Sequence, residues 1–144
     1  MMDYFKKQEN RPIAFVSMCA DPIHHGHINI LKIAKTYGKV VVGLMTDEAM
    51  ISYKSAPLSS FEDRLKVVEE LKSVDFVIPI DGIDYPNIAK KFKFEYFIHG
   101  DDWKNNIQSH ARKELLKIMP LWGGKVIDVP YTVGISSSKL KKLL

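Results

Sequence analysis

The sequence predicts an α/β fold: a doubly wound, parallel five-stranded sheet between helices, in three layers. Two patterns carry this prediction: short, continuously apolar runs recur along the chain, and runs with helical spacing separate them. Alternation of this kind is typical of parallel sheets with right-handed crossovers. The length of 144 residues suits one domain. We expect residues 1–10 to form a polar N-terminal extension and residues 11–144 a single domain.

The expected strands are apolar runs bounded by turn residues or charged residues. Such runs, lacking polar alternation, are typical of strands that are buried on both faces of a sheet. The strands are expected at residues 13–16, 40–45, 76–80, 96–99 and 125–129.

The expected helices carry start and stop signals. Gly38 is expected to end the first helix, which follows residue 27. Ser59 and Glu62 have the spacing of a capping box at the start of the next, and Pro86 opens a short third helix at its first turn. Further helices are expected at 107–119 and 136–144, and a less regular segment at 46–57.

Composition and charge narrow the class of protein. Hydrophobic residues make up 46% of the chain and charged residues 26%, as in ordinary globular proteins. The net charge of +4 suits an anionic small substrate, and lysines on solvated helix faces account for it equally well. Because the lysines are scattered, no nucleic-acid partner is expected. Cys19 is the single cysteine, which argues against a disulfide framework and a thiolate zinc site.

The stretch from Asp21 to His27 stands where the first strand gives way to the first helix. Unpaired N–H groups and the dipole at a helix N-terminus favour a bound anion, above all phosphate. Gly26 lets a ligand come close where a Cβ would collide. His24 and His27 can each donate a hydrogen bond, or a full charge if protonated, to phosphate oxygens. The alternative, two ordinary polar histidines at a helix start, is disfavoured by this context.

His24-His25-Gly26-His27 resembles the HxGH signature of the nucleotidyltransferase superfamily, whose members transfer a nucleoside monophosphate from a triphosphate. Three further matches resemble small bacterial cytidylyltransferases, and the resemblance runs from about residue 11 to the C-terminus. It implies a Rossmann-like nucleotidyltransferase fold and CMP transfer from CTP with release of pyrophosphate. The three matches are His99-Gly100-Asp101-Asp102-Trp103 with GDDW, residues 131–138 (YTVGISSS) with RTxGIST, and Arg64 with an arginine that follows a lysine-bearing loop.

By this resemblance the catalytic residues are His24, His27, Lys54 and Arg64. In-line attack on the α-phosphorus places negative charge on the nonbridging and leaving oxygens, so catalysis is mainly positioning and electrostatic stabilisation. The two histidines would hold those oxygens. Lys54 and Arg64 would neutralise the triphosphate or the acceptor, Arg64 by a bidentate grip. Surface charges on a loop and a helix are the alternative for these two.

The nucleotide-binding residues implied by the resemblance follow strand ends, where open parallel sheets bind ligands. Asp101 and Asp102 can accept hydrogen bonds from ribose or help hold a cation, and Trp103 offers a flat apolar face. The alternative is an acidic turn with an aromatic packed beneath it. Mg²⁺ is expected to arrive with CTP, with no metal ligands assigned in the chain. The full set is Met18, Cys19, Ala20, Asp21, Gly26, Gly100, Asp101, Asp102, Trp103, Thr132, Ile135, Ser136 and Ser137.

Two departures bear on the acceptor. Glycerol-3-phosphate cytidylyltransferases typically show GTFD where residues 18–21 read MCAD, and arginine where Tyr131 stands. These changes, with residues 53–57 (YKSAP) and the YTxGISS form of residues 131–137, resemble the nucleotidyltransferases associated with phosphoenolpyruvate phosphomutase in phosphonate biosynthesis. The expected acceptor is therefore a small phosphonate, such as 2-aminoethylphosphonate or 2-hydroxyethylphosphonate. The alternatives are a phosphate ester (glycerol-3-phosphate or phosphocholine) as acceptor, or an adenylyltransferase of the same superfamily.

Two other classes stay open at this point. A catalytically silent nucleotide-binding module would regulate a partner, but binding alone has no need of the full set of charge stabilisers. A class I aminoacyl-tRNA synthetase fragment would need a second lysine-rich signature and tRNA-binding domains, for which the chain is short. We also expect a cytoplasmic protein without membrane contact, because no signal peptide and no run of membrane-span length is present. The resemblance implies a homodimer.

Overall fold

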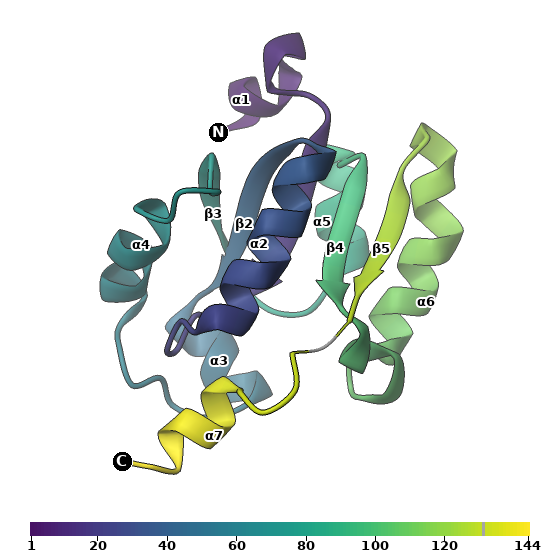
Figure 1. Cartoon of the computed structure of the whole chain (residues 1–144). Helices are drawn as coiled ribbons and strands as arrows, with labels where there is room; N and C mark the ends of the chain where they lie inside the picture. The colour runs from purple at the N-terminus through teal and green to yellow at the C-terminus, as the bar shows by residue number, and fades with distance from the viewer. Residues whose placement is uncertain (131) are drawn as a thin grey trace.

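The computed structural model of the chain describes residues 1–130 and 132–144. Five strands form one sheet in the order β3-β2-β1-β4-β5, and every neighbouring pair is parallel (Figure 1). This confirms the predicted parallel, doubly wound sheet. The strands are β1 (Ile13–Met18), β2 (Lys39–Met45), β3 (Phe76–Ile80), β4 (Tyr96–Gly100) and β5 (Lys125–Val129).

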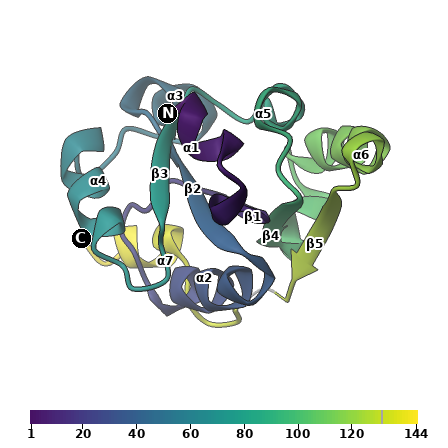
Figure 2. The same ribbon diagram turned by 90° about the horizontal axis from the view of Figure 1, so that it is seen from above.

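Helices cover both faces of the sheet, which makes the predicted three layers (Figure 2). On one face α2 (His25–Tyr37) and α4 (Phe61–Glu69) pack over the sheet. On the other lie α3 (Asp47–Tyr53), α5 (Tyr85–Phe92) and α6 (Ser109–Ile118). The remaining elements are α1 (Met2–Lys6), α7 (Ser137–Lys141) and the 3-10 helices η1 (Gln8–Asn10), η2 (Asp101–Asn105) and η3 (Met119–Trp122).

Strand β1 shows why the sheet is buried on both sides. Successive side chains of a strand point to opposite faces. Ala14 and Val16 join the core under α2, whereas Ile13 and Phe15 join the core under α5 and α6. A strand with two apolar faces reads as a continuous apolar run, which is why the sequence signal at β1 is strong.

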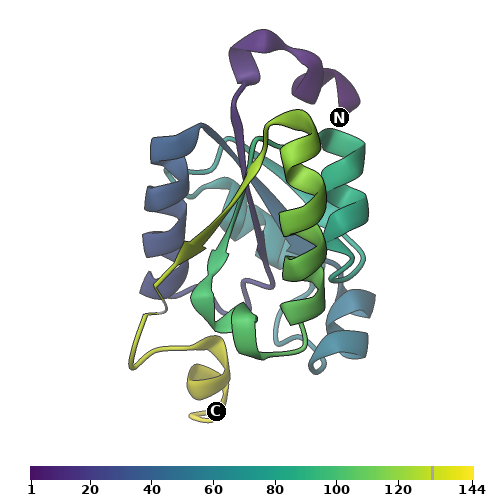
Figure 3. The ribbon, with the colours of Figure 1, turned by 90° about the vertical axis from the view of Figure 1, so that its right-hand side faces the viewer.

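The order in which strands are added to the sheet reverses between β1 and β4. The chain first adds β2 and β3 on one side of β1, and it later adds β4 and β5 on the other side. The crossover helix α2 lies on one face and α5 and α6 on the other (Figure 3). Open α/β sheets bind ligands at such a switch point, beyond the carboxyl ends of the strands. In Figure 3, α7 lies beyond those carboxyl ends and α1 beyond the amino ends.

Two helix starts differ from the prediction. The hydroxyl of Ser60, not of Ser59, caps α4 by accepting from the Asp63 N–H (3.3 Å). The Ser59 N–H, which a capping box would give to Glu62, is bound to Asp21 instead. Helix α3 lies within residues 46–57, which were expected to be less regular. Its start is capped by the Thr46 hydroxyl, which accepts from the Ala49 N–H.

The N-terminal residues, expected to be a polar extension, contain α1 and η1. Phe5 of α1 is buried, and its ring contacts those of Phe76, Phe92 and Phe94 in the main aromatic cluster. The Arg11 side chain ties this segment to the sheet by donating to the Phe5 carbonyl (2.7 Å). Among the described residues, no helix is long and apolar enough to cross a membrane.

Candidate active site

A pocket of about 340 Å³ opens at the carboxyl ends of β1, β2 and β4 and reaches both faces of the sheet. Its lining comes from loops that are far apart in the sequence, as expected for ligands at a switch point. The predicted residues that line it are Met18, Cys19, His24, Gly26, His27, Lys54, Gly100, Asp102, Thr132, Ile135, Ser136 and Ser137.

The two motif histidines hold each other in place at the start of α2. The Nδ1 of His24 accepts from the Gly26 N–H (3.0 Å), and the Nδ1 of His27 accepts from the His24 N–H (3.1 Å). The ring centroids are 4.1 Å apart. Because both Nδ1 atoms are acceptors, a neutral ring carries its proton on Nε2. Both rings line the pocket, so each brings an Nε2–H donor to it.

The environment keeps these rings neutral. Burial lowers the pKa of His27 to about 3, and the nearby His24 and Lys54 charges act in the same direction. Burial also lowers the pKa of His24, with a smaller effect from His25. At neutral pH the pair therefore offers two hydrogen-bond donors without a formal charge.

Gly26 has no room for a side chain. A Cβ at this position would lie 2.7 Å from Cε1 and 2.9 Å from Nδ1 of His24, on the ring that caps the helix. Glycine therefore lets the His24 ring fold back onto the first turn of α2, as the motif spacing requires.

The C-terminal segment is bound over the start of α2. The Ser137 hydroxyl donates to the Pro22 carbonyl (2.9 Å), and the Asn29 amide donates to the Thr132 hydroxyl (3.4 Å). The hydroxyl of Ser136 caps α7 by accepting from the Lys139 N–H. Tyr131, the position where relatives were expected to carry arginine, lies outside the described residues.

Lys54 stands between two pockets at the C-terminal end of α3. It lines the main pocket and a second one of about 290 Å³, whose lining includes Lys141 of α7. Among the described residues Lys54 forms no ion pair, so its ammonium group is available to an anion. Lys141 thus lies at a pocket and not on a solvated helix face, which was the alternative explanation for the lysines of this chain.

The structure corrects the role expected for Asp21. Its carboxylate accepts from the N–H groups of Leu58 and Ser59 and pairs with Lys141 (2.7 Å). Burial alone would raise the pKa of Asp21, but these hydrogen bonds hold it below its ordinary value. Asp21 is thus a tether between two loops rather than a residue of the main pocket. Ala20 is also buried outside that lining, in a left-handed backbone conformation (φ 56°).

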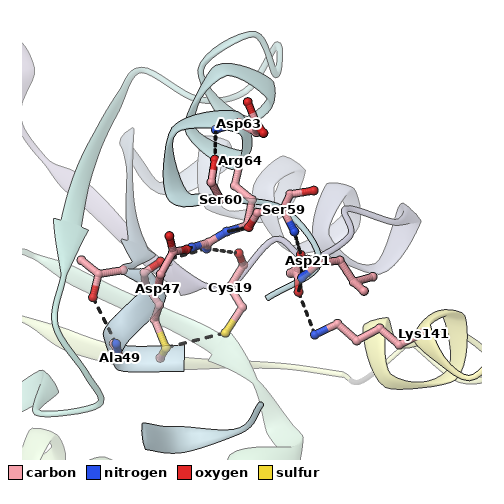
Figure 4. A network of polar contacts seen from close by, with 12 residues as sticks. Cys19, Asp21, Asp47, Ala49, Ser59, Ser60, Asp63, Arg64 and Lys141 are labelled. Atoms are coloured by element: carbon pink, nitrogen blue, oxygen red, sulfur yellow. Dashed lines mark hydrogen bonds and ion pairs between the residues drawn. The ribbon is translucent and has the colours of Figure 1, made fainter. Parts of the chain in front are cut away.

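The expected bidentate grip of Arg64 on a phosphate is corrected in the same way (Figure 4). Its guanidinium is 1% exposed. The Nη1 donates to the carbonyl oxygens of Cys19 (2.7 Å) and Met45 (2.8 Å), at the ends of β1 and β2. The Nε donates to the Ser59 carbonyl, and Nη2 pairs with Asp47 (2.8 Å). Arg64 therefore binds the chain's own acceptors and holds the pocket wall together.

Trp103 does not offer its face to a ligand. It is fully buried, its ring stacks on His99 at 4.2 Å between centroids, and its Nε1 donates to Asp128 (2.6 Å). Trp103 therefore matches the alternative interpretation, an aromatic residue packed beneath an acidic turn. Asp101 opens η2 outside the pocket lining, and only Asp102 of the two aspartates contributes to it.

The family model described as cytidylyltransferase-like matches residues 19–143, nearly the whole chain. The chain belongs to the cytidylyltransferase-like family. The HxGH resemblance and the Rossmann-like nucleotidyltransferase fold predicted from the sequence are thereby confirmed.

Named relatives of this cytidylyltransferase-like chain include proteins of several lengths. The bifunctional protein HldE of Sulfurimonas denitrificans is 32% identical over 83% of the chain, but the match spans 26% of that protein. Ethanolamine-phosphate cytidylyltransferase of Arabidopsis thaliana is 31% identical over 66% of the chain and 24% of its own length. Glycerol-3-phosphate cytidylyltransferase of Bacillus spizizenii is 32% identical, and the match covers 85% of this chain and 88% of that one.

Solved structures support the same fold. The lipopolysaccharide core biosynthesis protein of Thermoplasma volcanium superposes with a TM-score of 0.66 at 26% identity, covering 83% of this chain and 95% of the other. The pantoate-beta-alanine ligase of Francisella tularensis reaches a TM-score of 0.70 at 16% identity, over 97% of this chain and 70% of the other, which shows a shared fold.

Sequence reasoning missed a set of polar residues that line the far side of the pocket in this cytidylyltransferase-like chain. Four of them lie at or near the starts and ends of α3, α5 and α6, and their one sequence signal is a position beyond the carboxyl ends of β2, β3 and β4. The fifth, His99, lies in β4 at the head of the matched segment 99–103, where it was quoted without a role. These residues are Tyr53, Tyr85, His99, Asn106 and Gln108.

Proposed function

We propose that this chain transfers CMP from CTP to a small anionic acceptor and releases pyrophosphate. The observation that carries the proposal is the pair His24 and His27, whose neutral rings each bring one Nε2–H donor to a pocket at the start of α2. Donors that are fixed before the reaction stabilise developing oxygen charge without reorganisation, and such electrostatic stabilisation supplies much of the rate enhancement in many enzymes.

The reaction is an in-line displacement at the α-phosphorus. An acceptor oxygen forms the new P–O bond while the bond to the β-phosphate oxygen breaks, and the electron pair leaves with pyrophosphate. His24 and His27 hydrogen-bond the phosphate oxygens on which charge develops. A phosphate or phosphonate acceptor is already anionic, so the step needs no general base.

The two sides of the pocket fit the two substrates. The segment 132–138 and Gly100 line the side next to α2, which suits the nucleotide. Lys54 lines the side toward α3 and, with no ion pair among the described residues, suits an acceptor anion or the triphosphate. In-line geometry requires acceptor and leaving group on opposite sides of the α-phosphorus, and a pocket reaching both faces of the sheet supplies this room.

The acceptor is proposed to be a small phosphonate, from the resemblance of residues 53–57 and 131–138 to phosphonate cytidylyltransferases. The named relatives point to phosphate esters, glycerol-3-phosphate and ethanolamine phosphate, as the competing acceptors. Both classes share a dianionic head on a short tail, so the same cationic contacts serve either.

Mg²⁺ and a second copy of the chain complete the proposal. Mg²⁺ usually binds through one or two carboxylates plus phosphate oxygens, and it neutralises triphosphate charge. Asp102 is the one carboxylate that lines the main pocket within residues 1–130 and 132–144, so it is the residue that would hold the ion with CTP. A homodimer follows from the resemblance stated for the sequence.

The decisive experiment incubates the protein with Mg²⁺, each of CTP and ATP, and a panel of phosphonates and phosphate esters while pyrophosphate release is followed. We expect release with CTP and with at least one acceptor. Release with ATP and none with CTP would overturn the choice of nucleotide. No release with either would overturn the proposed activity.

A further inference from the structure

A buried chain of hydrogen bonds forms the floor of the pocket on the side away from α2. Tyr85 is 1% exposed, and its hydroxyl donates to Oε1 of Gln108 (2.9 Å). The Nε2 of Gln108 in turn donates to the hydroxyl oxygen of Tyr53. Gln108 is itself 6% exposed, so the amide is held between two tyrosines and away from solvent.

The two tyrosines define which way the Gln108 amide points. Its oxygen accepts from the Tyr85 hydroxyl, and its nitrogen donates to the Tyr53 oxygen. His99 packs beside Tyr85, with ring centroids 6.2 Å apart. Its Nδ1 lies 3.0 Å from the Gly100 carbonyl, which can only accept, so Nδ1 carries the proton, and burial lowers the pKa of this ring.

This order leaves one donor for a ligand. The Tyr53 oxygen already accepts from Gln108, so its own proton is free to point into the pocket, which Tyr53 lines. The other groups of the floor are satisfied by one another. The charged side chains that line the pocket in the described part of the chain are Lys54 and Asp102, and both are exposed at its mouth rather than buried at its floor.

We infer that Tyr53, positioned by Gln108 and Tyr85, is the binding subsite for the non-anionic end of the acceptor and selects a neutral, hydroxyl-bearing tail over an ammonium tail. The inference rests on the proposed function, because it assumes that the acceptor's anionic head lies toward Lys54. It is independent of whether that head is a phosphonate or a phosphate.

The chemistry of the floor supports a hydroxyl. A tail hydroxyl accepts the Tyr53 proton through its oxygen, whereas an ammonium group has no lone pair with which to accept it. An ammonium group here would meet neutral hydroxyl and amide groups and the positive Lys54, whose Nζ lies 5.7 Å from the centroid of the Tyr53 ring. Asp102, the carboxylate whose charge acts on Tyr53, is the residue proposed to hold Mg²⁺, so it is not left to pair with the tail. A buried charge without an ionised partner is strongly disfavoured. Burial raises the pKa of Tyr53 and of Tyr85, so neither hydroxyl becomes the anion that such a tail would need.

The test uses two acceptors that differ at one group, 2-hydroxyethylphosphonate and 2-aminoethylphosphonate. With CTP and Mg²⁺, we expect kcat/KM to be at least about tenfold higher for the hydroxyl acceptor, the value of one hydrogen bond. Equal values, or a preference for the amino acceptor, would overturn the inference while leaving the proposed transferase intact. Phosphate monoesters with the same two tails repeat the comparison for a phosphate head.

Two variants test whether residues of the pocket floor cause the preference for the hydroxyl acceptor. Tyr53→Phe removes only the donating hydroxyl and should reduce the hydroxyl-to-amino ratio about tenfold. Gln108→Glu places a carboxylate in the floor and should move the ratio toward the amino acceptor. Tyr37→Phe, on α2 and outside the pocket lining, is the matched control and should leave the ratio unchanged. A ratio that Tyr53→Phe leaves unchanged would contradict the role of Tyr53.

A direct binding measurement tests the Tyr53 subsite separately from the proposed transferase activity. Calorimetric titration of both phosphonates into the protein with CTP present measures the same preference without turnover, and thermal melting checks that each variant is folded. A protein that releases no pyrophosphate but binds the hydroxyl ligand more tightly, and loses this preference in Tyr53→Phe, would refute the proposed activity alone. Equal binding of both ligands would refute the subsite.

Discussion

At the scale of single residues, each motif histidine has two separable groups: Nδ1 accepts a backbone N–H, and Nε2 carries the proton that we propose is donated to the substrate phosphate. His27→Asn keeps an acceptor near the Nδ1 position, so the cap on His24 is retained, but it removes the Nε2–H donor. We expect kcat to fall about 100- to 1000-fold, as when an oxyanion donor is lost, with little change in melting temperature. Steady-state kinetics and thermal melting measure the two effects.

The pH profile distinguishes neutral from charged histidines. With a pKa of about 3 for His27, the ring carries no charge to lose between pH 6 and 8, and kcat should not fall across this range through deprotonation of His27. The unfolded chain, with an ordinary histidine pKa near 6.5, binds the proton first. His27 therefore stabilises the fold above about pH 6.5, and this contribution declines as pH falls toward 3. A kcat that drops with a pKa near 6.5 would contradict the neutral pair.

Arg64 provides the residue-scale test of a structural role. Arg64→Met leaves three carbonyl groups and the half-exposed Asp47 without their donor. Because each buried polar group left without its partner costs about 1–3 kcal/mol, the three carbonyls together predict a destabilisation of about 3–5 kcal/mol. We expect urea unfolding to show a loss of this size. Lys66→Met, exposed on the same helix, is the control. Unchanged stability with a large rise in the KM for CTP would return Arg64 to phosphate binding.

Arg64 and Trp103 show the limit of prediction for single residues. The sequence identified both as motif residues, but it could not identify the groups to which they hydrogen-bond. The acceptors of Arg64 lie on Cys19, Met45 and Asp47, which only the fold brings together. A sequence gives the hydrogen-bonding capacity of a side chain, whereas burial and competing partners decide whether a ligand can use that capacity.

At the scale of elements, prediction was most accurate at the two edge strands of the sheet. The bounds expected for β3 and β5 match the structure to the residue, because charged, glycine or proline residues flank both strands. The buried central strand β1 runs two residues beyond its expected end, because the polar Ser17 interrupts the apolar run. Helix α3 was missed because it is short, and its cap, Thr46, gave the only local signal. The floor of the pocket was missed because Tyr53, Tyr85 and Gln108 belong to three different elements and form no motif.

The ion pair between Asp21 and Lys141 links α7 to the loop after β1, and the same carboxylate binds the loop before α4 through the Leu58 and Ser59 N–H groups. This ion pair is the feature tested at the scale of elements. Lys141→Met breaks this pair at the second pocket and removes one of its two lysines. We expect the KM for CTP to rise about tenfold, because α7 carries the hydroxyls at the nucleotide side and a charged hydrogen bond is lost. Lys139→Met, exposed on the same helix, should change it little. Identical kinetics in both variants would leave the pair without a role in binding.

At the scale of the whole molecule, the two ends of the sheet have different jobs. The pocket lies at the carboxyl ends of the strands, and α1 lies at the amino ends (Figure 1). Residues of α1 therefore stabilise the fold without contacting the pocket. The core under α5 and α6 includes Phe5 and extends through Tyr85 and Trp103 to the pocket floor. One packed layer thus connects the N-terminal helix with the support of the proposed acceptor subsite.

Removal of the Phe5 side chain tests this separation. Phe5→Ala deletes a fully buried ring that contacts Phe92 at 4.5 Å between centroids, and such deletions lower the free energy of unfolding by about 3–5 kcal/mol. Met2→Ala, exposed on the same helix, should lower it by less than about 0.5 kcal/mol. Denaturant unfolding gives both values, and kcat of the folded Phe5→Ala protein should match the unsubstituted chain. A fall in kcat at temperatures where the variant is folded would mean that strain passes along the shared core to Tyr85, and the two ends would then be coupled.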